Sequence, residues 1–143
     1  PLYAMGAFAD TIEVAASWSR LLPMYEAVRA ALSPHVFVMA HFSHAYPDGA
    51  SIYFTFAGAA ATHEAAPEKY DRAWADALDA VLAAGGTVSH HHGIGRSKAG
   101  AMSRELGAAT SLLAALKSVM DPSGILNPGA LGIGSAIGGG NAV

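Results

Sequence analysis

The sequence contains no cysteine, which excludes disulfide bridges and thiolate metal sites. Charged residues are also scarce, at 13% of 143 residues, whereas 52% are hydrophobic. A disordered chain has the opposite profile. The sequence shows no secretory signal and no apolar run of the ~18 residues that a membrane-spanning helix needs. We therefore expect a folded, soluble and cytoplasmic protein without a transmembrane segment.

Positive charge is scarcer still. Eight Lys and Arg residues stand against eleven Asp and Glu residues, so the net charge is −3. Binding to nucleic acid or to an anionic membrane needs clustered Lys and Arg, and only Arg96, Lys98 and Arg104 come close together. We expect neither kind of partner. The chain begins at Pro1 rather than Met, which favours a piece of a longer protein.

Hydrophobic periodicity predicts alternating strands and helices. The predicted strands span residues 10–16, 36–44, 50–57 and 87–92, and the predicted helices span 19–32, 67–84, 99–106 and 108–120. Ser19 is the expected cap of the first helix, and Pro67 is the expected first residue of the second. The order β-α-β-β-α-β predicts an α+β fold: an antiparallel sheet with a split βαβ-like (ferredoxin-like) arrangement, helices on one face and a C-terminal helical segment.

The predicted hairpin between the second and third strands fixes the direction of one tyrosine. Residues 46–49 have the Pro-Asp-Gly chemistry of a turn. Alternation in the strand that follows places Ile52, Phe54 and Phe56 on one face and Tyr53 on the other.

We predict three parts: residues 1–98 as a cap or substrate domain, 99–132 as a helical return segment and 133–143 as a flexible Gly-rich tail.

A run of three histidines is the strongest candidate for a functional site. His90, His91 and His92 are followed by Gly93 and Gly95, which allow sharp turns or close approach of a ligand. Each imidazole can donate, accept, bind a metal or carry a proton near neutral pH. The run can therefore be a metal site, a set of buried structural side chains or the polar wall of an active site.

The metal interpretation is the weakest of the three. In a strand over 87–92, alternation would place His90 and His92 on one side and His91 on the other, so further ligands would have to come from elsewhere. The candidates for these ligands are His41, His44 and Asp48. Because cysteine and a helical His-Glu-x-x-His motif are both absent, we expect no metal.

Three segments carry a resemblance to a known family. Residues 49–56 (GASIYFTF), 85–95 (GGTVSHHHGIG) and 121–129 (DPSGILNPG) resemble, in order and spacing, the C-terminal part of the alkyl-dihydroxyacetonephosphate synthase family. These synthases are FAD enzymes of the vanillyl-alcohol oxidase type, and the resemblance covers roughly residues 10–132. The closing motif over residues 121–129 alone indicates only the wider flavoprotein group. The histidine triplet narrows the resemblance to the synthase family.

The resemblance implies a cap domain over the flavin ring of FAD. It implies that Tyr53 is the active-site acid or base and that the three histidines lie near the reacting flavin nitrogen and the substrate. The residues implied to contact the cofactor are His92, Gly93, Gly95 and Asn127. A phenol can exchange a proton with a substrate oxygen while a flavin carries the difficult step. Tyr53 can equally be a packed strand aromatic.

Two basic residues after the histidine run are weaker candidates. Arg96 and Lys98 could bind a phosphate group of the substrate, or they could be solvated charges after a loop. The second interpretation is slightly favoured.

The family's reaction exchanges the acyl chain of acyl-dihydroxyacetone phosphate for a fatty alcohol through a flavin adduct, without net oxidation. Related 2-hydroxy acid dehydrogenases carry a Gly-Asp-Gly-Asn-x-His stretch in the hairpin and a Glu before the last His-Gly. Residues 48–53 lack that Asn and His, and His91 stands where the Glu would be. An FAD-linked dehydrogenase of a 2-hydroxy acid or another alcohol stays open as an alternative.

The phosphate-binding FAD domain of this family lies upstream of the segment that the chain resembles. We expect that domain as a partner, together with a small-molecule or lipid-like substrate and a homodimeric assembly. The isolated chain is expected to bind FAD weakly and to be inactive. A self-associating module without catalysis is the non-enzyme alternative.

Overall fold

The computed structural model describes residues 3–134, which separate into two compact units. The first unit ends at His92 and the second begins at Gly93. The division that we predict after residue 98 stays a prediction. Most of the predicted tail, residues 135–143, lies outside the described residues.

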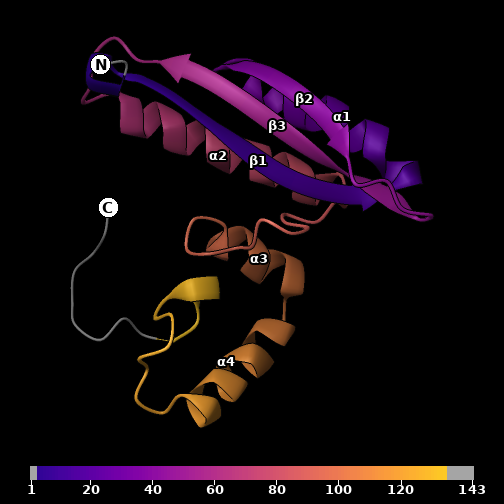
Figure 1. Cartoon of the computed structure of the whole chain (residues 1–143), viewed down its shortest axis with the longest axis vertical. Helices are drawn as coiled ribbons and strands as arrows, with labels where there is room; N and C mark the ends of the chain where they lie inside the picture. The colour runs from indigo at the N-terminus through magenta and orange to yellow at the C-terminus, as the bar shows by residue number, and fades with distance from the viewer. Residues whose placement is uncertain (1–2, 135–143) are drawn as a thin grey trace. The chain divides into compact units, whose positions relative to one another are not determined.

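The first unit is built on a three-stranded antiparallel sheet (Figure 1). The strand order is β1-β3-β2, so β3 lies antiparallel to both neighbours and the two outer strands run parallel to each other. This is the split βαβ arrangement, with α1 as the connection between the outer strands. The predicted α+β fold is confirmed. Its elements are η1 (Tyr3–Met5), β1 (Ala7–Ser17), α1 (Trp18–Leu32), β2 (Phe37–Ser43), β3 (Gly49–Ala59) and α2 (Ala66–Ala83).

The fourth predicted strand, over residues 87–92, is wrong. Only Thr87 pairs with the sheet, through an isolated bridge to Ala15 of β1. Beyond it, the backbone N–H groups of His90, His91 and His92 donate to the carboxylate of Glu13. Buried backbone N–H groups need a hydrogen-bond acceptor. Here the Glu13 carboxylate takes the place of the carbonyl groups that a neighbouring strand would supply.

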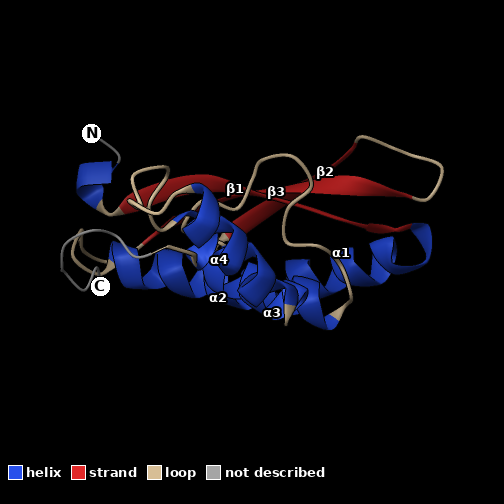
Figure 2. Cartoon of the chain, turned by 90° about the horizontal axis from the view of Figure 1, so that it is seen from below, coloured by secondary structure: helices blue, strands red, loops and turns tan. Residues whose placement is uncertain are grey.

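The core of this unit lies between the sheet and the two helices, which run along one face of it (Figure 2). Ile12 pairs with Phe54 and Val14 with Ile52, and all four side chains are fully buried. The intervening residues, Tyr53 among them, point to the opposite, open face, as the alternation predicts. From the helices, the core receives Leu21, Met24, Val28, Leu32, Ala73, Ala77, Leu78 and Val81.

The start of α1 differs from the prediction. The helix begins at Trp18 with Ser17 as its N-cap, two residues before the expected cap at Ser19. Trp18 forms two hydrogen bonds to the hairpin loop. Its backbone N–H donates to the Asp48 carbonyl at 3.1 Å, and its indole N–H donates to the Tyr46 carbonyl at 3.0 Å. The loop between β2 and β3 is thereby attached to the start of the helix.

The second unit contains α3 (Ala99–Leu106), α4 (Ala109–Met120) and η2 (Ala130–Gly132). Both predicted helices are present, the second starting one residue late. The side chain of Ala101 is buried in α3, whereas α4 has no buried residue. Within the described residues, no helix combines the length and hydrophobicity needed to cross a membrane.

Candidate active site

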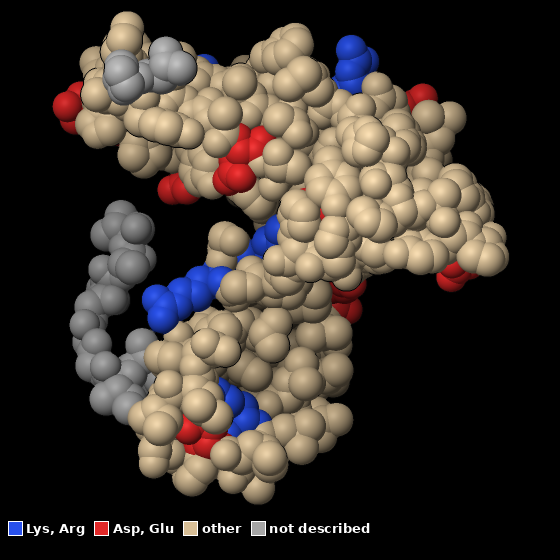
Figure 3. All heavy atoms as spheres, viewed as in Figure 1, with Lys and Arg blue, Asp and Glu red and all other residues tan. Residues whose placement is uncertain are grey.

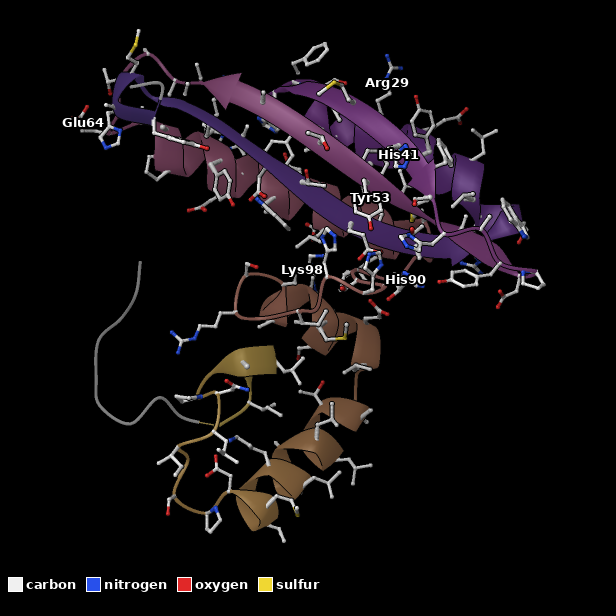
Figure 4. The ribbon with its side chains drawn as sticks, viewed as in Figure 1. Arg29, His41, Tyr53, Glu64, His90 and Lys98 are labelled. Atoms are coloured by element: carbon white, nitrogen blue, oxygen red, sulfur yellow. The ribbon has the colours of Figure 1, made fainter. Side chains whose placement is uncertain are left out.

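The open face of the sheet and the loop after α2 bring four predicted site residues together. Tyr53 lies on β3, and His90, His91 and His92 lie in the loop that ends the first unit. Figure 4 shows Tyr53 and His90 at the same end of this sheet, with His41 on the neighbouring strand. Register explains the position of His41, because it pairs directly with Tyr53.

Tyr53 is bonded to the middle histidine. Its Oη lies 2.5 Å from Nε2 of His91, and its ring lies 5.1 Å from that of His92. Desolvation raises the pKa of Tyr53 above its ordinary value, and the negative charge of Glu13 raises it further. The phenol therefore keeps its proton near neutral pH and can donate it.

Glu13 is the residue that organises the histidine loop. It lies on β1, directly opposite Tyr53 in the sheet register, and its side chain is fully buried. Its Oε2 accepts the backbone N–H groups of His90, His91 and His92 at 2.9, 3.2 and 3.4 Å. Burial alone would raise the pKa of Glu13, but these donors and the nearby His91 ring hold it below its ordinary value. The site therefore contains a fixed negative charge.

The other oxygen of this carboxylate faces two imidazoles. Glu13 Oε1 lies 3.2 Å from Nδ1 of His91 and 3.4 Å from Nδ1 of His90, and the two Nδ1 atoms lie 2.8 Å apart. The expectation that His90 and His91 point to opposite sides is wrong, because the loop is not a strand. Tyr53, His91 and Glu13 follow one another, joined by the hydrogen bond between Tyr53 and His91 and by the 3.2 Å contact between His91 Nδ1 and Glu13 Oε1. A phenol bonded to an imidazole in this way can exchange a proton.

Three residues of this site escaped the sequence analysis or were given another role. Glu13 was missed, although a carboxylate between Ile12 and Val14 in an apolar strand is a signal that could have found it. Tyr46 was also missed, and its ring lies 5.3 Å from that of His90. His44, considered only as a metal ligand, packs its ring 4.5 Å from that of His91.

The same cluster is a potential cation site. Among the described residues, donor atoms of Glu13, His90 and His91 all lie within 4.8 Å of one another. This set differs from the His41, His44 and Asp48 ligands considered from the sequence. The 2.8 Å separation of the two Nδ1 atoms is a hydrogen-bond distance. A hydrogen bond between the two imidazoles, with one Nδ1 as donor and the other as acceptor, is consistent with this distance.

The remaining predicted residues lie in the second unit. The carbonyl of Gly95 accepts the backbone N–H of Leu131 at 2.8 Å, and Arg96 donates to the Pro128 carbonyl at 2.7 Å. These bonds connect the glycine bend to the closing motif that contains Asn127. Gly93 and Gly95 have φ values of 82° and 55°, and a Cβ added to either would meet nothing within 4 Å.

The two basic candidates differ in their surroundings. The guanidinium of Arg96 is bonded to a backbone carbonyl, so part of its donor capacity is already used. Lys98 precedes α3 and is only 4% exposed. A solvated charge therefore does not describe Lys98.

Asp121 shapes the closing motif. Its carboxylate accepts the backbone N–H groups of Ile125 and Leu126 at 3.1 and 2.9 Å and is also bonded by the Lys117 ammonium. Lys117 donates in addition to the Leu126 carbonyl. The loop leads into Asn127, whose φ of 44° is a left-handed conformation that Asn tolerates better than most residues.

The residues around Tyr53 suit the ring system of a flavin. Their side chains are planar rings that carry hydrogen-bonding atoms and are partly open to solvent. They do not suit a pyrophosphate, because Glu13 places a negative charge beside them. In the view of Figure 3, Lys and Arg side chains are few and scattered over this unit.

Comparison with known proteins decides the family. Residues 2–131 match the model of the C-terminal domain of FAD linked oxidases. The chain belongs to this family. FAD is the cofactor that the family implies, and the members are oxidoreductases and synthases, so an enzyme family is established.

The curated relatives include both kinds of enzyme. The chain is 31% identical over 130 residues to alkyldihydroxyacetonephosphate synthase of Caenorhabditis elegans, an alignment that covers 84% of this chain and 22% of the relative. It is 30% identical over 138 residues to an uncharacterized FAD-linked oxidoreductase of Escherichia coli (strain K12), covering 88% of this chain and 28% of the relative. The chain thus spans roughly a quarter of the length of these relatives.

Solved structures support the fold. A 4-ethylphenol oxidase from Gulosibacter chungangensis matches with a TM-score of 0.67 and 19% identity, over 91% of this chain and 25% of that one. An alkyldihydroxyacetonephosphate synthase matches with a TM-score of 0.51 and 22% identity, over 86% of this chain and 20% of that one. The resemblance found in the sequence is confirmed at the level of family and fold.

Proposed function

We propose that this chain is the proton-handling and substrate-facing part of a longer FAD-dependent enzyme of the alkyl-dihydroxyacetonephosphate synthase type. The observation that carries the proposal is the 2.5 Å contact between Tyr53 Oη and His91 Nε2 on the open face of the sheet. A phenol bonded to an imidazole can give a proton to a substrate oxygen and take it back.

Each residue has its own part in this proposal. Tyr53 is the acid or base that touches the substrate oxygen, and His91 holds or accepts its proton. His90 and His92 line the same face and orient the substrate. FAD, when bound, supplies the redox or group-exchange chemistry. On the second unit, Gly93, Gly95 and Asn127 are proposed to contact the flavin, with Arg96 and Lys98 as weaker candidates for a substrate phosphate.

The proposed substrates are acyl-dihydroxyacetone phosphate and a fatty alcohol, which would make the protein part of ether-lipid synthesis. The similarity to a bacterial FAD-linked oxidoreductase supports a second candidate, oxidation of a 2-hydroxy acid or another alcohol. Binding of FAD mainly by an upstream domain, inactivity of the isolated chain, a homodimer and a cytoplasmic location belong to the same proposal.

The test uses the complete enzyme with the upstream domain present. Tyr53→Phe removes only the hydroxyl, so turnover should fall by about 10²–10⁴-fold while the flavin absorbance remains. Tyr25→Phe is the matched control, because Tyr25 lies on the opposite side of the sheet and stacks on Phe54. Unchanged turnover in the Tyr53 variant would assign Tyr53 to packing.

The two reactions can be separated in the same assay. Exchange consumes a fatty alcohol and releases a fatty acid without any electron acceptor, whereas oxidation reduces the flavin and stops unless an acceptor is present. Failure of the chain to support either reaction, with the upstream domain supplied and the flavin bound, would favour the self-associating module.

A further inference from the structure

We propose that Glu13 is a positioning residue that holds the proton of the neutral His91 ring on Nδ1, so that Nε2 faces the Tyr53 hydroxyl as an acceptor. This inference rests on the proposed role of Tyr53 as a proton carrier. It adds a third member, from a different strand, to the pair of Tyr53 and His91.

The first support is the placement of the two ring nitrogens of His91. Nε2 lies 2.5 Å from Tyr53 Oη, and Nδ1 lies 3.2 Å from Glu13 Oε1. A neutral imidazole carries one proton, and a carboxylate can only accept. The charge of Glu13 therefore favours the tautomer with the proton on Nδ1. That tautomer presents a lone pair to the phenol.

The second support is the rigidity of Glu13 itself. Its side chain is fully buried, and its Oε2 is held by the three backbone N–H groups of residues 90–92. The carboxylate therefore cannot swing away from the ring that it faces. The same three bonds fix the loop that carries His91, so one residue sets both the position and the protonation of the imidazole.

His90 is the competitor for the same proton. Its Nδ1 lies 2.8 Å from Nδ1 of His91 and 3.4 Å from Glu13 Oε1. If His90 donated to His91, the proton of His91 would move to Nε2 and the phenol would become the acceptor. The other titratable groups around the cluster are Tyr53, His44, His92 and Tyr46, which contact the imidazoles through their rings or hydrogen bonds.

The tautomer can be read directly on the 143-residue chain without flavin. With ¹⁵N-labelled histidine, long-range ¹H–¹⁵N spectra distinguish the protonated ring nitrogen, at a pH well above ~6.5, the ordinary imidazole pKa. We expect the native His91 to be protonated on Nδ1. Protonation on Nε2, or zinc found on the native chain by elemental analysis, would overturn the proposal before any variant is made.

Glu13→Gln tests the cause. The amide oxygen of Gln can still accept the backbone donors, so the amide shifts of residues 90–92 should stay in place while the preference for the Nδ1 proton is lost. Asp10→Asn is the matched control: Asp10 lies on the same strand but bonds Tyr70 on the helix-covered face, so its removal should leave the His91 tautomer unchanged.

Two results would contradict the proposal. One is an unchanged His91 tautomer in Glu13→Gln. The other is a displaced loop in that variant, which would make Glu13 an anchor of the backbone only. Tyr53→Phe should keep the native tautomer, because the carboxylate rather than the phenol sets it. Since none of these spectra involves turnover, failure here leaves the catalytic test of Tyr53 independent.

Discussion

The two units of the chain are stabilised in different ways. In the first, a sheet and two helices enclose a core that includes fully buried Phe54 and Phe56. In the second, α4 has no buried residue, and most of its large apolar side chains are exposed to solvent, with Leu113 half-buried. The exposed apolar residues of α4 and the loop after it are Leu112, Leu116, Val119, Met120, Ile125 and Leu126.

Polar contacts take the place of a core in the second unit. Asp121 binds Lys117 and two backbone N–H groups, and Arg96 and Gly95 bond to the closing motif. Because buried apolar area is the main source of folding free energy, we expect the first unit to fold as an independent domain. The second unit should depend on local hydrogen bonds.

The largest expected effect on the free energy of unfolding is the loss of a buried aromatic side chain in the first unit, compared with an exposed apolar side chain in the second. Phe54→Ala removes a fully buried side chain and should lower the free energy of unfolding by about 3–5 kcal/mol. Leu116→Ala, at a side chain that is 53% exposed, should change it by less than about 0.5 kcal/mol. Urea unfolding followed by circular dichroism measures both. Similar losses in the two variants would remove the difference between the units.

A smaller, local effect is expected at the closing motif. Asp121→Asn weakens the bonds to Lys117, Leu126 and Ile125, so amide exchange at residues 125 and 126 should accelerate roughly tenfold. Hydrogen–deuterium exchange followed by NMR measures these rates. The exchange rates of the β3 amides in the same spectra are the internal control and should not change.

The pH dependence of this motif has a definite sign. Lys117 and the backbone N–H of Leu126 hold the pKa of Asp121 below its ordinary value. Protection at residues 125 and 126 should therefore be present above the pKa of an unfolded Asp and be lost as pH falls through the lower folded value. Protection that does not change with acid would show that another contact holds this loop.

The smallest effect concerns a polar contact at the edge of the first unit's core. Burial, followed by the hydrogen bond to Asp10, raises the pKa of Tyr70 from 10 to about 12. The folded state keeps the proton more tightly than the unfolded state. The associated stabilisation is therefore complete below pH 10 and is lost as pH rises to about 12.

Tyr70→Phe should abolish that alkaline loss. Solvent screening reduces the difference to about 1 kcal/mol, because Tyr70 is only partly buried. The measurement compares the unfolding free energy of the native chain and the variant across this pH range, with Tyr25→Phe as control. Parallel pH curves for the native chain and Tyr70→Phe would contradict the assignment.

Local patterns predicted most of the fold. The alternation in β3 correctly separated Tyr53 from Phe54 and Phe56, since side-chain direction in a strand follows from sequence position alone. Pro67 marked the start of α2 to within one residue: the helix begins at Ala66 and Pro67 is its second residue, in the first turn for which proline is preorganised.

The candidate site was only half predictable. The sequence identified Tyr53 and the three histidines but not their partner Glu13, which is separated from His90 by 77 positions. The bonds that connect them are made by backbone N–H groups, which every residue except proline carries, so no side-chain motif marks them. The same bonds explain why Thr87 and Val88, good strand residues, do not extend into a fourth strand.

The hydrogen bonds between Glu13 and the backbone of residues 90–92 also make the conformation of this loop independent of the functional groups that its side chains carry. Because Oε2 of the carboxylate binds backbone N–H groups, which every residue except proline carries, this hold on the main chain does not depend on which side chains stand at positions 90–92. Exchanging these side chains would present new functional groups at an unchanged location.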